Sequence, residues 1–298
     1  MSKATWTLGR AVLARLVAGA GLFAGMSAHA QMPPEWSKAQ KPFQIYGDTY
    51  YVGTQGLSSI LIASKNGHVL IDGALPTSAQ LIVANIRALG FRIEDVKLIL
   101  NSHVHFDHAG GIAELQKLSG AVVAASAASA KVLRSGDVDQ DDPQFGQLPP
   151  INRVASVQVV IDGETQKVGE IQVTPYFTPG HTPGGTSWTW QSCEQNKCLQ
   201  IVYADSLNPI SAKGYRYTDS ARKPNGVEQL EKSFAKLRSV SCDILLVPHP
   251  ELADLFGKLA KLEQKATYKP FVDPDGCKQY VAISREKLNK RIADEQLP

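Results

Sequence analysis

The amino-acid sequence predicts a layered α/β fold. Short apolar segments of strand length recur along the chain, and segments with an apolar stripe at helical spacing alternate with them. Of the 298 residues, 43% are hydrophobic and 20% are charged. This balance is ordinary for a globular protein and argues against a disordered, coiled-coil or collagen-like chain. Neither a linker nor a repeat divides residues 31–298, so we expect a single domain there.

The N-terminal part of this domain is predicted to be a β-meander. Short strands are expected at residues 43–46 and 50–52. Two more, at residues 60–63 and 68–71, flank the dipeptide Asn66-Gly67, which is the strongest short-range signal for a β-hairpin. These four strands should therefore lie in one sheet.

Helices and strands alternate in the rest of the domain. Thr77 or Ser78 can cap the first helix, and Gly90 is a typical stop signal after its last turn. Alternation of this kind indicates helices that cover the faces of sheets. The predicted elements are, in chain order, a helix with the apolar face Ile82, Ile86 and Leu89, a strand at 96–100, a helix with the stripe Ile112, Leu115 and Leu118, strands from 122 and at 157–161, 171–176, 187–190 and 199–203, a helix bearing Val227, Leu230, Phe234 and Leu237, a strand at 243–247, and a C-terminal helix that includes 287–292.

Residues 1–30 are predicted to form a signal peptide. Three basic residues and no acidic residue accompany an apolar run at residues 11–26, and Ala28-His29-Ala30 has the pattern that precedes a cleavage site. A membrane anchor is the alternative, but Arg15 interrupts the run, and no apolar stretch reaches the roughly 18 residues that span a bilayer. We therefore expect a periplasmic or secreted protein, released by cleavage near Ala30.

The charge balance gives no sign of a macromolecular partner. Lys and Arg total 31 against 28 Asp and Glu, and three of the basic residues belong to the predicted signal peptide. The mature chain is thus formally neutral and has no bulk attraction to nucleic acid or to an anionic membrane. We therefore expect a soluble protein without nucleic acid or a membrane as a partner.

The four cysteines predict two disulfides. Four cysteines permit three pairings. Cys193 and Cys198 flank a polar turn, so local pairing across a hairpin is the simplest choice, and Cys242 and Cys277 would then close a loop of about 35 residues. A zinc knuckle is the competing interpretation, but neither pair has C-x-x-C spacing. Disulfides also suit an exported protein.

Six residues of metal-ligand type gather in three segments of the chain. Four lie in one hexapeptide, HVHFDH, between an apolar strand and a helix, and two occupy later loops bounded by glycine or proline. A single histidine beside a proline is more often structural, but the hexapeptide at a strand end together with two loop histidines is a much more specific pattern. The six are His103, His105, Asp107, His108, His181 and His249.

The chemistry of these side chains suits zinc. A strand-to-helix corner lets successive side chains diverge, so His103 and His105 can point one way while Asp107 and His108 point another. We therefore expect two ligand sets and two zinc ions. Neutral imidazoles and a carboxylate are zinc ligands, and three protein ligands per ion leave a coordination position for water. His68, outside these segments, is predicted to be structural.

These residues resemble the metallo-β-lactamase superfamily, whose fold is an αββα sandwich with a zinc site at one edge of its two sheets. The resemblance runs from Phe43 to the C-terminal helix. It is strongest to subclass B3, because subclass B1 has a cysteine where Ser206 stands and subclass B2 has an asparagine in place of His103. The Pro-His-Pro around His249 and the Cys242–Cys277 pair support the same choice.

The resemblance also implies roles for individual residues. His103, His105 and His181 would hold the first zinc, and Asp107, His108 and His249 the second. A zinc-bound hydroxide, with Asp107 as the catalytic residue beside it, would open the β-lactam ring of antibiotics, which would confer antibiotic resistance.

Several further residues receive expectations from the same resemblance. Ser206 and Asn208 stand where the family contacts the substrate carboxylate, although Ser or Thr is commoner than Asn at the second position. Asp72 would be a buried carboxylate that supports the metal loop, and Asp205 would turn away from the metals. The loop at residues 137–150 could cover the cleft.

Two rival functions remain open from the sequence. Thioesterases of the glyoxalase II type, lactonases and phosphodiesterases of the same fold share H-x-H-x-D-H and use an aspartate that bridges both metals, a role that Asp205 could fill. A non-enzymatic exported zinc-binding protein is the second rival. It would need a closed ligand shell, whereas three ligands per ion predict open coordination.

Overall fold

The computed structural model describes Met1 and residues 32–264 and 269–297. The predicted signal peptide at residues 1–30, its cleavage near Ala30 and the start of the domain at residue 31 therefore lie outside the described residues. The described residues from 33 onward form one compact unit. Within the described residues, every helix is too short or too polar to cross a lipid bilayer.

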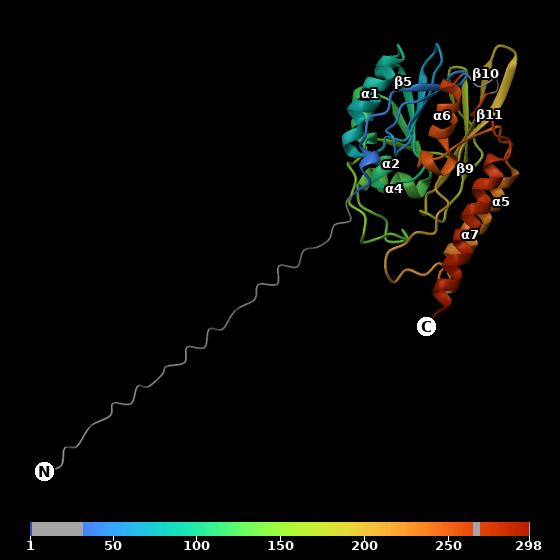
Figure 1. The fold of residues 1–298 in the computed structure, drawn as a ribbon. Coiled ribbons are helices and arrows are strands. Elements are labelled where there is room, and N and C mark those ends of the chain that lie inside the picture. The colour runs from blue at the N-terminus through green and yellow to red at the C-terminus, as the bar shows by residue number, and fades with distance from the viewer. Residues whose placement is uncertain (2–31, 265–268, 298) are drawn as a thin grey trace. The chain divides into compact units, whose positions relative to one another are not determined.

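The strands of the described residues form two sheets (Figure 1). Strands β1 to β4 pair antiparallel, as the meander prediction requires, and β4 to β7 pair parallel. In the second sheet β8 to β11 pair antiparallel and β12 is parallel to β11. The first sheet contains β1 (Phe43–Tyr46), β2 (Thr49–Tyr51), β3 (Ile60–Ile62), β4 (His68–Ile71), β5 (Val96–Leu100), β6 (Val122–Ala125) and β7 (Val157–Val159), and the second contains β8 (Gln166–Val168), β9 (Ile171–Phe177), β10 (Thr186–Glu194), β11 (Lys197–Tyr203) and β12 (Ile244–Leu246), in the spatial order β12-β11-β10-β9-β8.

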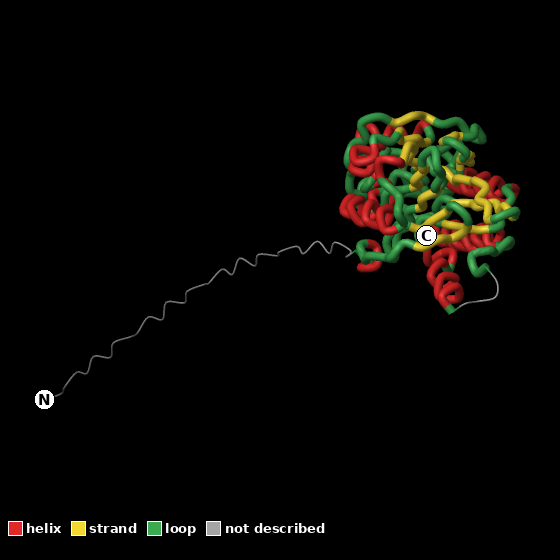
Figure 2. The backbone as a smooth tube through the Cα atoms, turned by 90° about the horizontal axis from the view of Figure 1, so that it is seen from above, coloured by secondary structure: helices red, strands yellow, loops and turns green. Residues whose placement is uncertain are grey.

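Helices cover the outer face of each sheet, and Figure 2 shows the strands between helical layers. Helices α1, α3 and α4 pack on the first sheet, and α5 and α7 pack on the second. Helix α6 contributes Leu255 to the core between the sheets. The helices are α1 (Ala79–Ala88), α2 (Phe106–Ala109), α3 (Ile112–Ser119), α4 (Ala127–Ser135), α5 (Gly226–Ser239), α6 (Leu255–Glu263) and α7 (Gly276–Gln296), with short 3-10 turns at Pro34–Trp36, Pro76–Ser78, Ile93–Asp95 and Pro250–Ala253.

Three apolar cores separate the four layers, which confirms the predicted αββα sandwich. On β5, Leu98 and Leu100 belong to the core between the sheets, whereas Ile99 belongs to the core under the helices. On β11, Tyr203 faces the core between the sheets and Val202 faces the helices. This alternation follows from the two-residue period of a strand, and burial of both faces explains why these strands are apolar throughout.

Several elements differ from the sequence prediction. Helices α2, α4 and α6 and strand β8 were not predicted. Helix α4 is built largely from Ala and Ser, so it carries too few large apolar residues for a helical stripe to stand out. The β10–β11 hairpin extends beyond its predicted strands, from Thr186 to Tyr203, because its solvent-exposed end is polar and pairs through the backbone.

Both predicted disulfides are present. Cys193 and Cys198 are directly opposite each other in the β10–β11 hairpin and are bonded. Cys242, just before β12, is bonded to Cys277 in the first turn of α7. The second bond therefore attaches the C-terminal helix to the edge of the second sheet.

Candidate metal centre

The six ligand-type residues meet where loops leave both sheets. HVHFDH follows the end of β5, His181 lies in the loop between β9 and β10, and His249 follows β12. The structure groups them as two sets, with the ligand atoms of each set within 4.8 Å of one another. The sets are His103, His105 and His181, and Asp107, His108 and His249, which is the division that the resemblance implied.

A buried carboxylate builds the turn that carries the hexapeptide. Asp72 Oδ1 accepts hydrogen bonds from the Ser102 backbone N–H at 2.7 Å and from Asn101 Nδ2 at 3.2 Å. Its Oδ2 accepts from the hydroxyls of Ser102 at 2.6 Å and Tyr203 at 2.8 Å. Asp72 is 0% exposed, so these four donors replace the water it loses. Asp72 thus joins β4, the turn after β5 and the end of β11.

The hexapeptide then diverges as predicted. His105 is the residue before α2, and Asp107 and His108 lie within that one-turn helix. The side chains of His103 and His105 therefore project from backbone that precedes the helix, while those of Asp107 and His108 project from its single turn. This change of backbone direction separates the two ligand sets.

Each histidine of the first set is held through one ring nitrogen. His103 Nδ1 is 2.7 Å from Asp205 Oδ1, His105 Nε2 is 3.0 Å from Asp142 Oδ2, and His181 Nδ1 is 2.9 Å from the Asn208 carbonyl oxygen. The Asn208 carbonyl oxygen can only accept, so His181 Nδ1 carries the proton of its ring, and a carboxylate oxygen is the partner of the other two rings. The other nitrogen of each ring keeps its lone pair, which is how metal-binding histidines are oriented in proteins.

The free nitrogen of His103 fits a metal ligand. His103 Nε2 is buried and has no hydrogen-bond partner among the described residues. Burial, followed by the positive charge of neighbouring histidines, holds the pKa of His103 well below its usual value. Burial likewise lowers the pKa of His181 to about 3. Both rings are therefore neutral near pH 7, the form that binds metal.

The second set has the spacing of a zinc site. His108 Nε2 lies 3.2 Å from Asp107 Oδ2 and 3.2 Å from His249 Nε2, and His249 Nε2 lies 3.5 Å from Asp107 Oδ2. Ligands at roughly 2.0–2.2 Å from a tetrahedral zinc ion are about 3.3–3.6 Å apart. The three atoms thus fit around one ion of this size.

Two members of the second set, Asp107 and His249, have charges suited to a cation, whereas Asp107 raises the pKa of His108, whose ring must lose its proton when a metal binds. Burial would raise the pKa of Asp107, but the charge and hydrogen bond of His108 outweigh it and lower that pKa. Burial, the largest effect, lowers the pKa of His249 to about 4. An ionised carboxylate and a neutral imidazole are the ligand forms of these residues.

The loop at His181 depends on a glycine. The Gly184 carbonyl accepts a hydrogen bond from the Ser129 hydroxyl of α4 at 3.1 Å. A Cβ atom at position 184 would lie only 2.2 Å from that hydroxyl oxygen. Glycine therefore lets the loop pack directly on the start of α4, which positions His181 between the two sheets' loops.

Sequence analysis expects Asp205 to turn away from the metals, and the structure places it behind a metal-ligand residue, His103. Its carboxylate is fully buried and contacts the His103 ring. Strand β11 ends at Tyr203, so the alternation of strand side chains does not extend to Asp205 and Ser206. The contact is to Nδ1, on the opposite side of the ring from the unpaired Nε2.

The two residues expected at the substrate have different surroundings. Ser206 is 1% exposed beside Asp205, and Asn208 is half-buried. The Asn208 backbone holds His181, and its side-chain Oδ1 accepts a hydrogen bond from Lys287 Nζ at 2.9 Å.

Sequence reasoning missed two residues beside the ligands. Asp142 is one of four aspartates between residues 137 and 142, and nothing in their pattern distinguishes it from the others. Trp36, in the 3-10 turn near the start of the described domain, packs on His249 with ring centroids 5.3 Å apart. No local motif marks Trp36, because its contact depends on the fold alone.

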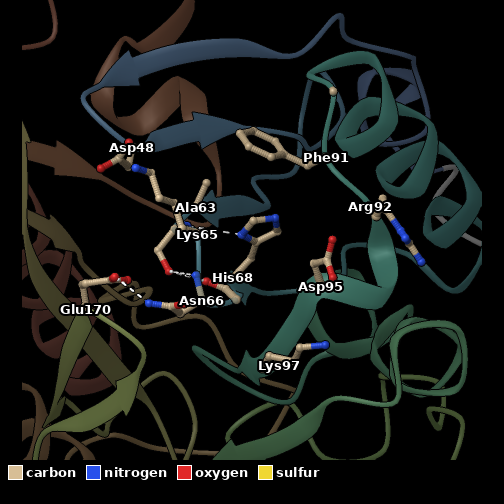
Figure 3. Close-up of a pocket in the computed structure, with 13 residues that line it drawn as sticks. Asp48, Ala63, Lys65, Asn66, His68, Phe91, Arg92, Asp95, Lys97 and Glu170 are labelled. Atoms are coloured by element: carbon tan, nitrogen blue, oxygen red, sulfur yellow. Dashed lines mark hydrogen bonds between the residues drawn. The ribbon is translucent and has the colours of Figure 1, made fainter.

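A separate cavity of about 860 Å³ lies at the other end of β4 and β5 (Figure 3). His68 is 5% exposed there, accepts a hydrogen bond from the Ser64 N–H at 3.2 Å and packs edge-on against Phe91. Its surroundings are those of a structural histidine, as expected. The metal-ligand residues follow the opposite end of β5, so this cavity is not part of the candidate centre.

Known proteins match this geometry and sequence. The model of the metallo-beta-lactamase superfamily matches residues 52–194. The Rm3 metallo-β-lactamase structure is 50% identical and superimposes with a TM-score of 0.86 over 88% of this chain and 97% of that one. MEM-A1, a subclass B3 metallo-β-lactamase from a soil metagenome library, is 50% identical with a TM-score of 0.85 over 87% and 98%. The chain therefore belongs to the metallo-β-lactamase superfamily, and its likeness to subclass B3 is confirmed.

Curated relatives match over a shorter stretch. The hydroxyacylglutathione hydrolase of Rhodospirillum rubrum is 29% identical over 149 residues, which are 50% of this chain and 49% of that protein. The chain spans between 49% and 59% of the length of the first curated relatives that it matches.

Proposed function

We propose that this protein is an exported hydrolase that binds two zinc ions and opens the β-lactam ring of antibiotics. The observation that carries the proposal is the pair of three-residue ligand sets, in a chain that is 50% identical to the Rm3 metallo-β-lactamase over 97% of that structure. His103, His105 and His181 would hold one ion, and Asp107, His108 and His249 the other. Five imidazoles and one carboxylate favour zinc among the common divalent metals.

When bound, zinc polarises a carbonyl group and lowers the pKa of water. The chain contributes three imidazoles that are already oriented by oxygen atoms on their far sides. Orientation before binding reduces the entropy lost when ligands and substrate are held in place. The acceptors behind the rings therefore fix the orientation of the ligand side chains before a metal and a substrate bind.

Asp107 is the residue we propose for proton transfer. Its Oδ2 lies with the second ligand set, 3.2 Å from His108 Nε2 and 3.5 Å from His249 Nε2. Its Oδ1 is then available to accept a proton from the attacking water and to return it to the lactam nitrogen as the ring opens. Ser206 and Asn208 would line the substrate side of the same centre.

Export and biological role belong to the same proposal. The disulfides Cys193–Cys198 and Cys242–Cys277 suit an oxidising compartment. We propose that the protein acts there as a monomer on a small molecule, without nucleic acid or membrane as partners, and that its role is antibiotic resistance.

A thioesterase, lactonase or phosphodiesterase function is the alternative, and the likeness to hydroxyacylglutathione hydrolase keeps it worth testing. Such enzymes would need Asp205 between the two metals. Its Oδ1 is occupied instead by His103 Nδ1 at 2.7 Å, which supports the β-lactamase proposal. Each set offers three protein ligands, which leaves a coordination position for water or substrate, and this likewise supports an enzyme over a zinc-storage protein.

The test compares three substrates in one preparation. Purified protein should hydrolyse a carbapenem, lose that activity with a chelator and regain it when zinc is restored. A thioester and a lactone are assayed beside it. Turnover of either one without β-lactam hydrolysis would contradict the proposal.

A further inference from the structure

Helix α7 lies along the loop that follows β11 and is joined to it by one row of polar side chains. The row repeats at spacings of seven, four and four residues, which places its members on one face of the helix. Tyr280 bonds Asp205 and Leu207, Lys287 bonds Asn208, Arg291 bonds Ser211 and Tyr215, and Glu295 bonds Tyr217 and Thr218.

Lys287 is the cation of this row that bonds a residue in contact with a metal-ligand side chain. Its Nζ donates to Asn208 Oδ1 over 2.9 Å, and the backbone carbonyl of the same Asn208 holds His181 Nδ1 over 2.9 Å. One residue therefore separates the Lys287 ammonium from a ligand of the first set. Lys287 is exposed, so its other two N–H donors face solvent or an incoming group.

The bond to Lys287 also determines which way the Asn208 amide points. An ammonium group can only donate, so the oxygen of the amide must face it. The Nδ2 group of Asn208 is left as a donor. Lys287 and Asn208 together thus present N–H groups and one positive charge, a combination that matches a carboxylate.

A cavity of about 340 Å³ adjoins this pair. Ile210, which is 52% exposed, supplies an apolar wall, Lys287 and Lys290 supply positive charge, and Asp294 supplies one negative charge. Arg291 also lines the cavity, but its guanidinium is already bonded to Glu295, Ser211 and Tyr215. Lys287 differs from Arg291 in that it bonds Asn208 itself, the residue whose backbone carbonyl contacts His181.

We propose that Lys287 is a specificity-determining residue: its ammonium, positioned by Asn208, binds the carboxylate of the substrate, and the cavity beside it receives the substituent next to that carboxylate. This inference rests on the proposed β-lactamase function. It adds a cation of the C-terminal helix to the loop residues Ser206 and Asn208. The Asn208 bond limits the freedom of a long lysine side chain before substrate arrives, which reduces the entropy cost of binding.

The test uses a penicillin and its methyl ester, which lacks the negative charge. Lys287→Met should raise KM for the acid on the order of tenfold, because a charge-assisted contact is lost, while kcat changes little. KM for the ester should stay as in the parent protein. Lys287→Arg should restore most of the affinity for the acid.

Lys278→Met is the matched control, since Lys278 lies on the same helix and, within the part of the chain that the structure describes, its ammonium pairs only with Asp275 at 3.1 Å. It should leave both substrates unaffected. KM of the parent for the acid should rise with salt concentration, and that dependence should weaken in Lys287→Met. Zinc content and melting temperature of each variant check that the fold is intact.

The outcomes separate the two proposals. If the parent hydrolyses both substrates but Lys287→Met changes acid and ester equally, or neither, Lys287 is not the carboxylate contact. If the parent hydrolyses no β-lactam, the proposed function is wrong and the assignment of Lys287 falls with it.

Discussion

Asp142 Oδ2 lies 3.0 Å from His105 Nε2, so a carboxylate from the loop at residues 137–150 holds a ligand of the first metal set. Asp142 is 2% exposed. The same loop bonds the loop after β11, where the Ala212 N–H donates to the Pro143 carbonyl at 2.8 Å. The segment that sequence analysis considered only as a cover is therefore joined to the centre itself.

Asp142→Asn should weaken binding of one zinc ion by about 10–100-fold, the usual effect of losing a carboxylate behind a metal-binding histidine. The neutral amide is a poorer acceptor and no longer requires the proton on Nε2 of His105. Competition with a metal indicator measures the affinity. Asp141→Asn is the control, because Asp141 is the exposed neighbour of Asp142 and its Oδ1 lies 3.5 Å from the Arg222 guanidinium instead of a metal-ligand residue. Equal affinities in both variants would show that Asp142 does not act through His105.

Asp205→Asn and Ser206→Ala should have different effects. Asp205 orients His103, so its amide variant should lose affinity for one ion and keep the other. Ser206→Ala should keep both ions and raise KM for β-lactams by an amount equivalent to about 1–3 kcal/mol. Metal analysis and kinetics measure the two effects. Loss of both ions in Asp205→Asn, with no β-lactam turnover in the parent, would instead favour a bridging aspartate.

Asp107→Asn tests the second ligand set. The wild-type protein should hold about two zinc ions at saturation, because six ligands divide into two sets of three. Replacing the carboxylate by an amide should weaken the second ion and slow hydrolysis strongly. Elemental analysis after dialysis gives the count. One ion in saturated wild-type protein would refute the two-site proposal.

The metal-free protein should lose stability as the pH falls from about 6.5 to about 4. Burial lowers the pKa of His181 to about 3 and that of His249 to about 4. The unfolded chain therefore binds more protons than the native protein in this range, and the free energy of unfolding falls on the order of 1.4 kcal/mol per pH unit for each histidine.

The contribution of His108 to the pH dependence of stability has the opposite sign, because the interaction with Asp107 outweighs burial and raises the pKa of His108. Its contribution is present at low pH and is lost as the pH rises through its native pKa. A stability maximum near pH 6.5 is expected in urea unfolding with chelator present. Asp72 and Asp205 oppose this effect, because burial raises their pKa values, so NMR titration of the two rings is the direct check, and ordinary pKa values for His181 and His249 would contradict the prediction.

The predicted signal peptide gives a direct chemical test. If export cleaves the chain after Ala30, N-terminal sequencing or mass spectrometry of the exported protein should begin at Gln31, in open or cyclised form. A product that retains Met1 or stays membrane-bound would contradict this prediction.

Local patterns in the sequence were sufficient to predict several strands, both disulfides and the ligand candidates of this protein. The hairpin at Asn66-Gly67, the apolar strand before HVHFDH and the two cysteine pairs all appear in the structure where they were predicted. Each depends on spacing within a short segment or on chemistry that few residue types can provide. The six ligand candidates stood out for the same reason.

Only the tertiary structure decided how the ligands are held. The partners of His103 and His105 lie 102 and 37 residues away, and Lys287 is 79 residues from Asn208. An aspartate or lysine in a loop or on a helix face looks the same in the sequence whether it meets water or a buried imidazole. Its partner is set by how β11, α7 and the loop at residues 137–150 pack against the end of β5, and packing between distant segments leaves no periodic pattern in either of them.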